Sequence, residues 1–168
     1  MPEDLEGLKM RAPALLFAEM FKALGSTAII MSWSELYTSL KTGVVDGAEG
    51  PISLIYQTKL YEVAKYLSIT NHIPSAHYFI VNKSWYDALP SDLKLVFDKS
   101  IEEASQIAYN VEKEQTENVM EEFSKTGAII NNVKDPNAFR EKLSDWKQKY
   151  VNEKGAAWVD LYQKMLSK

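Results

Sequence analysis

The chain contains no cysteine, and this absence removes several kinds of chemistry at once. It excludes disulfides, thiolate nucleophiles and zinc sites with cysteine ligands. Histidine is nearly as scarce, because His72 and His77 are the only two and no H-E-x-x-H pattern occurs. A G-x-S-x-G nucleophile turn and a phosphate-binding G-x-x-x-x-G-K-[ST] loop are also missing. The sequence therefore predicts no catalytic residue, no metal site and no cofactor, and these patterns give no support to an enzyme.

Arginine and long apolar runs are scarce too. Arg11 and Arg140 are the only arginines among 19 basic residues, and the net charge is −4. Nucleic-acid-binding proteins carry basic, often arginine-rich faces, so no nucleic-acid partner is expected. No apolar run approaches the ~20 residues that span a bilayer. The first residues, M-P-E-D, lack the basic and apolar regions of a signal peptide.

The first half of the chain does contain an alternation of strand-like and helix-like segments. Ser32 and Glu35 form a capping box, and Gly25 and Gly43 stand where helices should end. The apolar run at 27–31 is typical of a strand buried on both faces. Alternating strands and helices predict an α/β fold with a short, mostly parallel sheet. The expected strands are 8–11, 27–31, 66–70 and 77–81, and the expected helices are 14–24, 32–43 and 51–64.

The second half of the chain is mainly helical. A pattern at 91–124 predicts one helix of roughly 50 Å, a length that usually bridges two lobes. A strand follows at 128–131, and Asp135-Pro136 starts another helix as N-cap and first residue. The apolar stripe of the long helix comprises Leu93, Phe97, Ile101, Ala104, Ala108 and Val111. The later helices carry stripes at Phe139, Leu143, Trp146 and Tyr150, and at Trp158, Leu161, Tyr162 and Met165.

Four residues lie where strands are expected to end, which is where ligands gather in open α/β sheets. Arg11 offers a rigid fork that matches a carboxylate, although a surface ion pair is the more common role of a single arginine. Trp33 could pack against a ligand's carbon skeleton or simply cover the core. Glu49 could orient a positive group, and Gly50 leaves the backbone approachable, although an ordinary turn also explains both.

Three ordered segments carry a resemblance to a known family. Residues 8–13 resemble the G-L-K-[IL]-R-x-P segment of TRAP-transporter solute receptors of the DctP type. Residues 31–49 resemble that family's M-x-[FW]-S-E-x-Y-x-A-L-Q-T-G-x-V-D-G-x-E, and residues 61–72 resemble Y-E-V-x-K-Y-L-x-x-T-N-H. The resemblance covers roughly 70 residues in order and spacing. It implies a periplasmic-binding-protein-like lobe with a long lobe-bridging helix and C-terminal helices.

The resemblance also implies a function and a site. Such receptors close over a small organic acid and deliver it to membrane permease subunits in the periplasm. Arg11 corresponds to the arginine that pairs with the substrate carboxylate, and Trp33 to the aromatic residue that lines the pocket. Gly50 follows Glu49 where many members carry Asn, and the loss of that side chain is expected to remove a donor and open room. His77 falls where a residue can face the cleft.

Residues 1–7 resemble a segment deep inside a full receptor, so the chain is expected to be a truncated, C-terminal half without a signal peptide. Residues 1–75 plus 116–168 would form the C-terminal ligand-binding lobe, and residues 76–115 would complete a missing first lobe. The uncovered apolar surface predicts a homodimer, possibly domain-swapped. Because a truncated chain would have only one wall of the ligand cleft, weak ligand binding is expected. Two alternatives to a receptor are an oligomeric interaction module without ligand binding and an α/β enzyme acting on a carboxylate.

Overall fold

A computed structural model describes residues 1–73 and 78–166. Its first sheet contains β1 (Lys9–Ala12), β2 (Thr27–Ile30) and β3 (Gly47–Ala48) in the order β2-β1-β3, and both strand pairs are parallel. The register places Arg11 of β1 opposite Ile29 of β2 and opposite Ala48 of β3. All three strands therefore deliver their carboxyl ends to one edge of the sheet.

The elements between these strands follow the local sequence signals. The 3₁₀ helix η1 (Pro2–Leu5) precedes β1, and α1 (Leu15–Ala23) joins β1 to β2. After β2 the capping box of Ser32 and Glu35 opens η2 (Trp33–Glu35), which continues into α2 (Leu36–Lys41). Gly25 and Gly43 both adopt positive φ just after a helix, as the caps predict.

A second, two-stranded parallel sheet pairs β4 (Tyr66–Ile69) with β5 (Ile129–Asn132). The helix α3 (Ile52–Gln57) and the 3₁₀ helix η3 (Leu60–Glu62) precede β4. The aromatic rings of Tyr56 and Tyr61 pack edge-on against Phe123, with centroids 5.4 and 5.9 Å away. This contact fixes the far end of the long helix to the first part of the chain.

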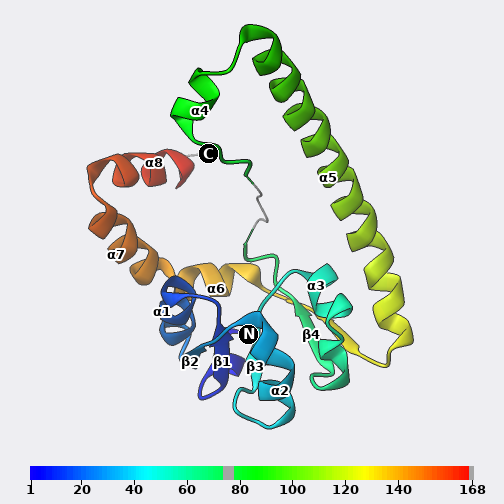
Figure 1. Cartoon of the computed structure of the whole chain (residues 1–168). Coiled ribbons are helices and arrows are strands. Elements are labelled where there is room, and N and C mark those ends of the chain that lie inside the picture. Colours follow the sequence, from blue (N-terminus) through cyan, green and yellow to red (C-terminus); the bar gives the residue numbers. More distant parts are fainter. Residues whose placement is uncertain (74–77, 167–168) are drawn as a thin grey trace.

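The long helix α5 (Ser91–Lys125) is a single helix of 35 residues, as predicted. It runs along one side of the molecule from the sheets to the short helix α4 (Lys83–Asp87), which the sequence did not predict (Figure 1). Only Val119 and Phe123 are buried along α5 in the described structure. The predicted apolar stripe of its N-terminal half is therefore only partly covered: Phe97, Ile101 and Ala104 are half-buried, whereas Leu93 and Val111 at its two ends are exposed. Val96 and Ile107, which lie outside the stripe, are exposed as well.

Three helices complete the chain: α6 (Pro136–Lys142), α7 (Ser144–Lys154) and α8 (Ala156–Leu166). Asp135 caps α6 as predicted, because its carboxylate accepts from the backbone N–H groups of Asn137 and Ala138. The stripe that begins at Phe139 spans two helices rather than one, since α6 ends at Lys142 and α7 begins at Ser144. Leu143 and its neighbours pack with α1 around Met10, Ala18 and Phe21 in the main core cluster.

Two strand predictions need correction. Residues 74–77 lie outside the described structure, and Tyr78 to Val81 form no strand and are exposed, with Ile80 at 88%. The composition of this segment favours a strand, but the described residues provide no sheet edge beside it. The strand β2 is not buried on both faces, because it is an edge strand whose first and last residues are exposed.

Candidate functional site

The carboxyl ends of the first sheet bring four of the predicted residues together. Arg11 lies in β1, Trp33 follows β2 at the start of η2, and Glu49 and Gly50 follow β3. Because β1 lies between β2 and β3, Arg11 is flanked on both sides by these loops. The fifth predicted residue, His77, lies outside the described residues.

Arg11 is the centre of this cluster. The residue is 5% exposed, and its Nε donates a hydrogen bond of 3.1 Å to the carbonyl oxygen of Met31. The guanidinium carbon lies 5.3 Å from the centroid of the Trp33 ring, within the range of a cation–π contact. These two contacts hold the guanidinium in place through Nε and one face. They leave its two terminal nitrogens for a further partner.

Glu49 is the negatively charged residue that interacts electrostatically with Arg11. Its side chain is 17% exposed, and burial raises the pKa of the carboxyl, although the nearby Arg11 counteracts that shift. Burial likewise lowers the pKa of Arg11, and Glu49 opposes that change. In both residues desolvation is the larger effect, so the mutual attraction does not fully offset the cost of burying the two charges.

His72 joins the cluster although the sequence analysis did not place it there. Its Nε2 lies 3.9 Å from Oε2 of Glu49, and its Nδ1 is 2.7 Å from the hydroxyl oxygen of Thr70. Burial lowers the pKa of the imidazole, which favours the neutral ring. His72 is the last residue of the segment 61–72 that resembles the receptor family. Its position just after the predicted strand at 66–70 is the sequence signal that could have placed it near the other strand ends.

Trp33 has two roles at once. Its ring packs against the second core cluster of Leu36, Val45 and Leu60, as the core alternative predicted. It also lies over Arg11 and against the backbone of Gly50. The indole Nε1 is buried and has no hydrogen-bond partner among the described residues. An unpaired buried donor is costly, so the position of the indole is maintained by its packing and its contact with Arg11 and not by a hydrogen bond.

The expectation that Gly50 opens room in the site is wrong. A Cβ atom on Gly50 would lie 2.6 Å from Cη2 and 2.8 Å from Cζ3 of Trp33. The space that a side chain at position 50 would need is therefore filled by the indole. The glycine makes a close approach possible instead of leaving a gap.

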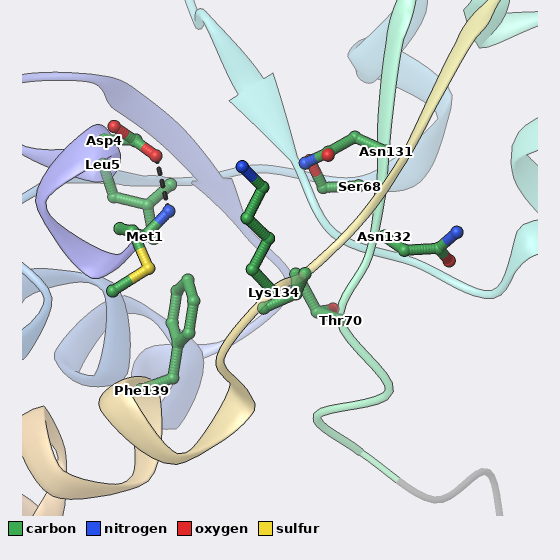
Figure 2. Close-up of a pocket in the computed structure, with 10 residues that line it drawn as sticks. Met1, Asp4, Leu5, Ser68, Thr70, Asn131, Asn132, Lys134 and Phe139 are labelled. Atoms are coloured by element: carbon green, nitrogen blue, oxygen red, sulfur yellow. Dashed lines mark hydrogen bonds and ion pairs between the residues drawn. The ribbon is translucent and has the colours of Figure 1, made fainter.

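A separate cavity of about 310 Å³ lies beside this cluster (Figure 2). It is bounded by η1 on one side and by the ends of β4 and β5 on the other, and Thr70 is its link to His72. None of the four predicted site residues that the structure describes lines it. Its wall comprises Met1, Asp4, Leu5, Ser68, Thr70, Asn131, Asn132, Val133, Lys134 and Phe139.

The described residues contain neither a metal-binding cluster nor a membrane-spanning helix. No cluster of three or more histidine, aspartate or glutamate side chains in residues 1–73 and 78–166 is arranged to hold a metal ion. No helix in the described part of the chain is both long and apolar enough to cross a membrane.

Comparison with known proteins identifies the group to which this architecture is similar. The model of the family described as bacterial extracellular solute-binding protein, family 7, matches residues 1–154. A C4-dicarboxylate-binding periplasmic protein of Rhodobacter capsulatus is 39% identical over 129 residues, which are 76% of this chain and 38% of that protein. A 2,3-diketo-L-gulonate-binding periplasmic protein of Escherichia coli is 31% identical and covers 86% of this chain and 44% of its own length. The chain thus spans less than half the length of these relatives.

Solved structures show the same relationship. A TRAP periplasmic solute-binding protein from Desulfovibrio salexigens with bound orotic acid has a TM-score of 0.83 and 28% identity. The match covers 97% of this chain and 55% of that protein. A second one, from a Sulfitobacter species with bound β-D-galacturonate, has a TM-score of 0.82 and 29% identity over 95% and 53%. Both the α/β fold and the parallel strands of this chain are therefore those of TRAP solute-binding proteins.

Proposed function

The chain belongs to the bacterial extracellular solute-binding protein family 7, and on that premise we propose that it binds a small organic carboxylate through Arg11 for a TRAP-type transporter. The matched relatives are solute-binding proteins and not enzymes, so the enzyme alternative is set aside. In this proposal the site comprises Arg11, Trp33, Glu49 and Gly50, with His77 as a residue that faces the cleft. The acid would be taken up in the periplasm and passed to membrane permease subunits.

The observation that carries the proposal is the state of Arg11. A buried guanidinium loses hydration, and its cost is recovered only when charged or hydrogen-bonding partners surround it. Here Nε has a carbonyl partner and one face has an indole, while Glu49 acts on it without a contact ion pair among the described residues. A ligand carboxylate could accept from both terminal nitrogens, and such a bidentate pair is among the stronger polar contacts.

The proposed mechanism is closure of two lobes over the acid. Residues 1–75 plus 116–168 would form the ligand-binding lobe, and residues 76–115 would belong to the other lobe. The exposure of Tyr78 to Val81 and of the first half of α5 supports this division, because apolar surface of this kind is normally covered. A ligand would favour the closed arrangement to the extent that it binds that arrangement more tightly.

Replacement of Arg11 by lysine tests the proposal. Lysine keeps the positive charge but cannot form the planar fork or keep the Nε bond to Met31, so Arg11→Lys should weaken carboxylate binding about tenfold or more. Titrations with orotate, D-galacturonate and succinate, followed by ¹H–¹⁵N NMR, detect even millimolar affinities. Arg140→Lys is the matched control, because Arg140 is exposed and bonds to Asn137 within its own helix. Equal binding by the two variants would remove Arg11 from the site.

The alternative function is that of an oligomeric module, and the exposed area favours it. A compact monomer of 19.1 kDa exposes about 8,400 Å², whereas this chain exposes 11942 Å². The excess is about 3,500 Å² per chain, which is more than the roughly 1,000–2,500 Å² that each partner buries in a large permanent interface. A homodimer would bury the open face of α5 and the segment at 78–81. A monomeric mass by light scattering at micromolar concentration would contradict it.

A further inference from the structure

The backbone of Gly50 lies so close to the ring of Trp33 that a side chain at position 50 and the observed position of the indole exclude each other. A Cβ atom at position 50 would overlap Cη2 and Cζ3 of the indole, whereas Ile55 would be at an ordinary 3.8 Å. Gly50 is not among the glycines with positive φ. Glycine is therefore required here for space and not for backbone conformation, and an alanine would test the contact with Trp33 alone.

The indole is confined on its other sides as well. One part of the ring packs with the cluster of Leu36, Val45 and Leu60, and another lies 5.3 Å from the guanidinium carbon of Arg11. A side chain at position 50 could be accommodated only if the ring moved away from Gly50. Because the core cluster blocks one direction, such a move would disturb the contact between Trp33 and Arg11.

We propose that Gly50 and Trp33 act as one specificity element, in which the glycine lets the indole form a flat, apolar wall directly beside the carboxylate anchor Arg11. The inference rests on the proposed function of Arg11. A planar acid would pair its carboxylate with the guanidinium and lay its ring along the indole.

The charges of the site point to the same ligand class. The charged group that acts on Arg11 is Glu49, which is half-buried and bears the opposite sign to the guanidinium. A second carboxylate on a short ligand would approach Glu49 and be repelled, because like charges in a poorly solvated site cannot be screened well. The element thus selects acids with a single carboxylate on a flat ring over short dicarboxylates.

The first test measures whether the two positions are coupled. Gly50→Ala should lower the melting temperature by about 3 °C or more when Trp33 is present. In combination with Trp33→Phe, which keeps an apolar ring but lacks the overlapping atoms, the same change should have little effect. Gly47→Ala is the control, since its Cβ would meet the flexible end of Met10 at 2.9 Å and not the indole. Its effect should be the same with and without Trp33→Phe.

The second test measures selectivity by NMR titration with orotate and with succinate. The unmodified chain should bind orotate at least about tenfold more tightly than succinate, and Gly50→Ala should reduce this ratio to near one while Gly47→Ala preserves it. The inference would be overturned if the melting-temperature changes of Gly50→Ala and Trp33→Phe simply add in the double variant. It would also be overturned if Gly50→Ala leaves the ratio of orotate to succinate affinity unchanged while orotate still binds through Arg11. If the unmodified chain binds neither acid, the proposed function itself fails, and the selectivity fails with it.

Discussion

Phe123 is the residue whose removal should most clearly alter how the long helix is held. Its side chain is 1% exposed, and it packs edge-on against Tyr56 of α3 and Tyr61 of η3. The N-terminal half of α5 has comparable aromatic contacts at Phe97, but these join it to Trp85 and Tyr86 of the neighbouring helix α4 and not to the sheets. The contact of Phe123 is therefore the aromatic contact that fixes the helix to the part of the chain that carries Arg11.

The expected cost follows from the burial. Replacement of a buried phenylalanine by alanine costs about 3–5 kcal/mol, as the transfer energy of the ring and the cavity left behind add together. Two edge-on aromatic contacts are lost as well, each worth ~0.5–1.5 kcal/mol beyond the buried area, which places Phe123→Ala in the upper part of this range. For a domain of this size the melting temperature should fall by roughly 6–20 °C.

Urea denaturation followed by circular dichroism measures this change. Ile107→Ala is the control, because Ile107 lies on the same helix but is 63% exposed, and its loss should cost about 0.5 kcal/mol or less. If the two variants lose the same stability, α5 is not anchored through Phe123. If Phe123→Ala loses helical signal before the main transition, the C-terminal part of α5 detaches without global unfolding.

Two further predictions concern the titration of the site and a helix cap. The lowered pKa of His72 means that the unfolded chain takes up the proton first, so stability should fall as the pH drops from 6.5 through that lowered pKa. His72→Asn should flatten the dependence of the urea midpoint on pH between 7 and 5, and an unchanged profile would show that the partly exposed imidazole loses too little hydration on folding to shift its pKa. Asp135→Ala should cost about 1 kcal/mol, because its carboxylate caps two N–H groups of α6. Asp135→Asn is the control and should retain most of the stability in the same denaturation assay.

The elements that the sequence predicted well carry their own local signals. The ends of α1 and α2 are set by glycines that adopt positive φ, and the start of α6 by a proline after an aspartate cap. The failures lack such signals. Residues 78–81 have the composition of a strand, but a strand exists only beside a partner edge. The break between α6 and α7 at Leu143 has neither glycine nor proline and follows from packing around α1.

The site was predictable in part for a general reason. Arg11, Trp33, Glu49 and Gly50 come together because parallel neighbouring strands end at one edge, and chain order alone suffices to place them there. His72 was not predictable in the same way, because β4 lies in a different sheet and its distance to Glu49 depends on how the two sheets sit. The effect of Gly50 was predicted with the wrong sign, since it depends on the rotamer of Trp33.

Buried polar groups without a hydrogen-bond or ion-pair partner are concentrated where the strands of the first sheet end. The capping residues Ser32 and Asp135 find hydrogen-bond partners within a few residues along the chain. At the strand ends, by contrast, Arg11 is buried without a contact ion pair, Glu49 bears the cost of desolvation, and the indole Nε1 of Trp33 has no acceptor. Three such costs at one place would be selected against in a purely structural edge. An anion that bonds to the guanidinium would supply Arg11 with the ion-pair partner that it lacks among the described residues, which is why a carboxylate is the ligand that we propose for this edge.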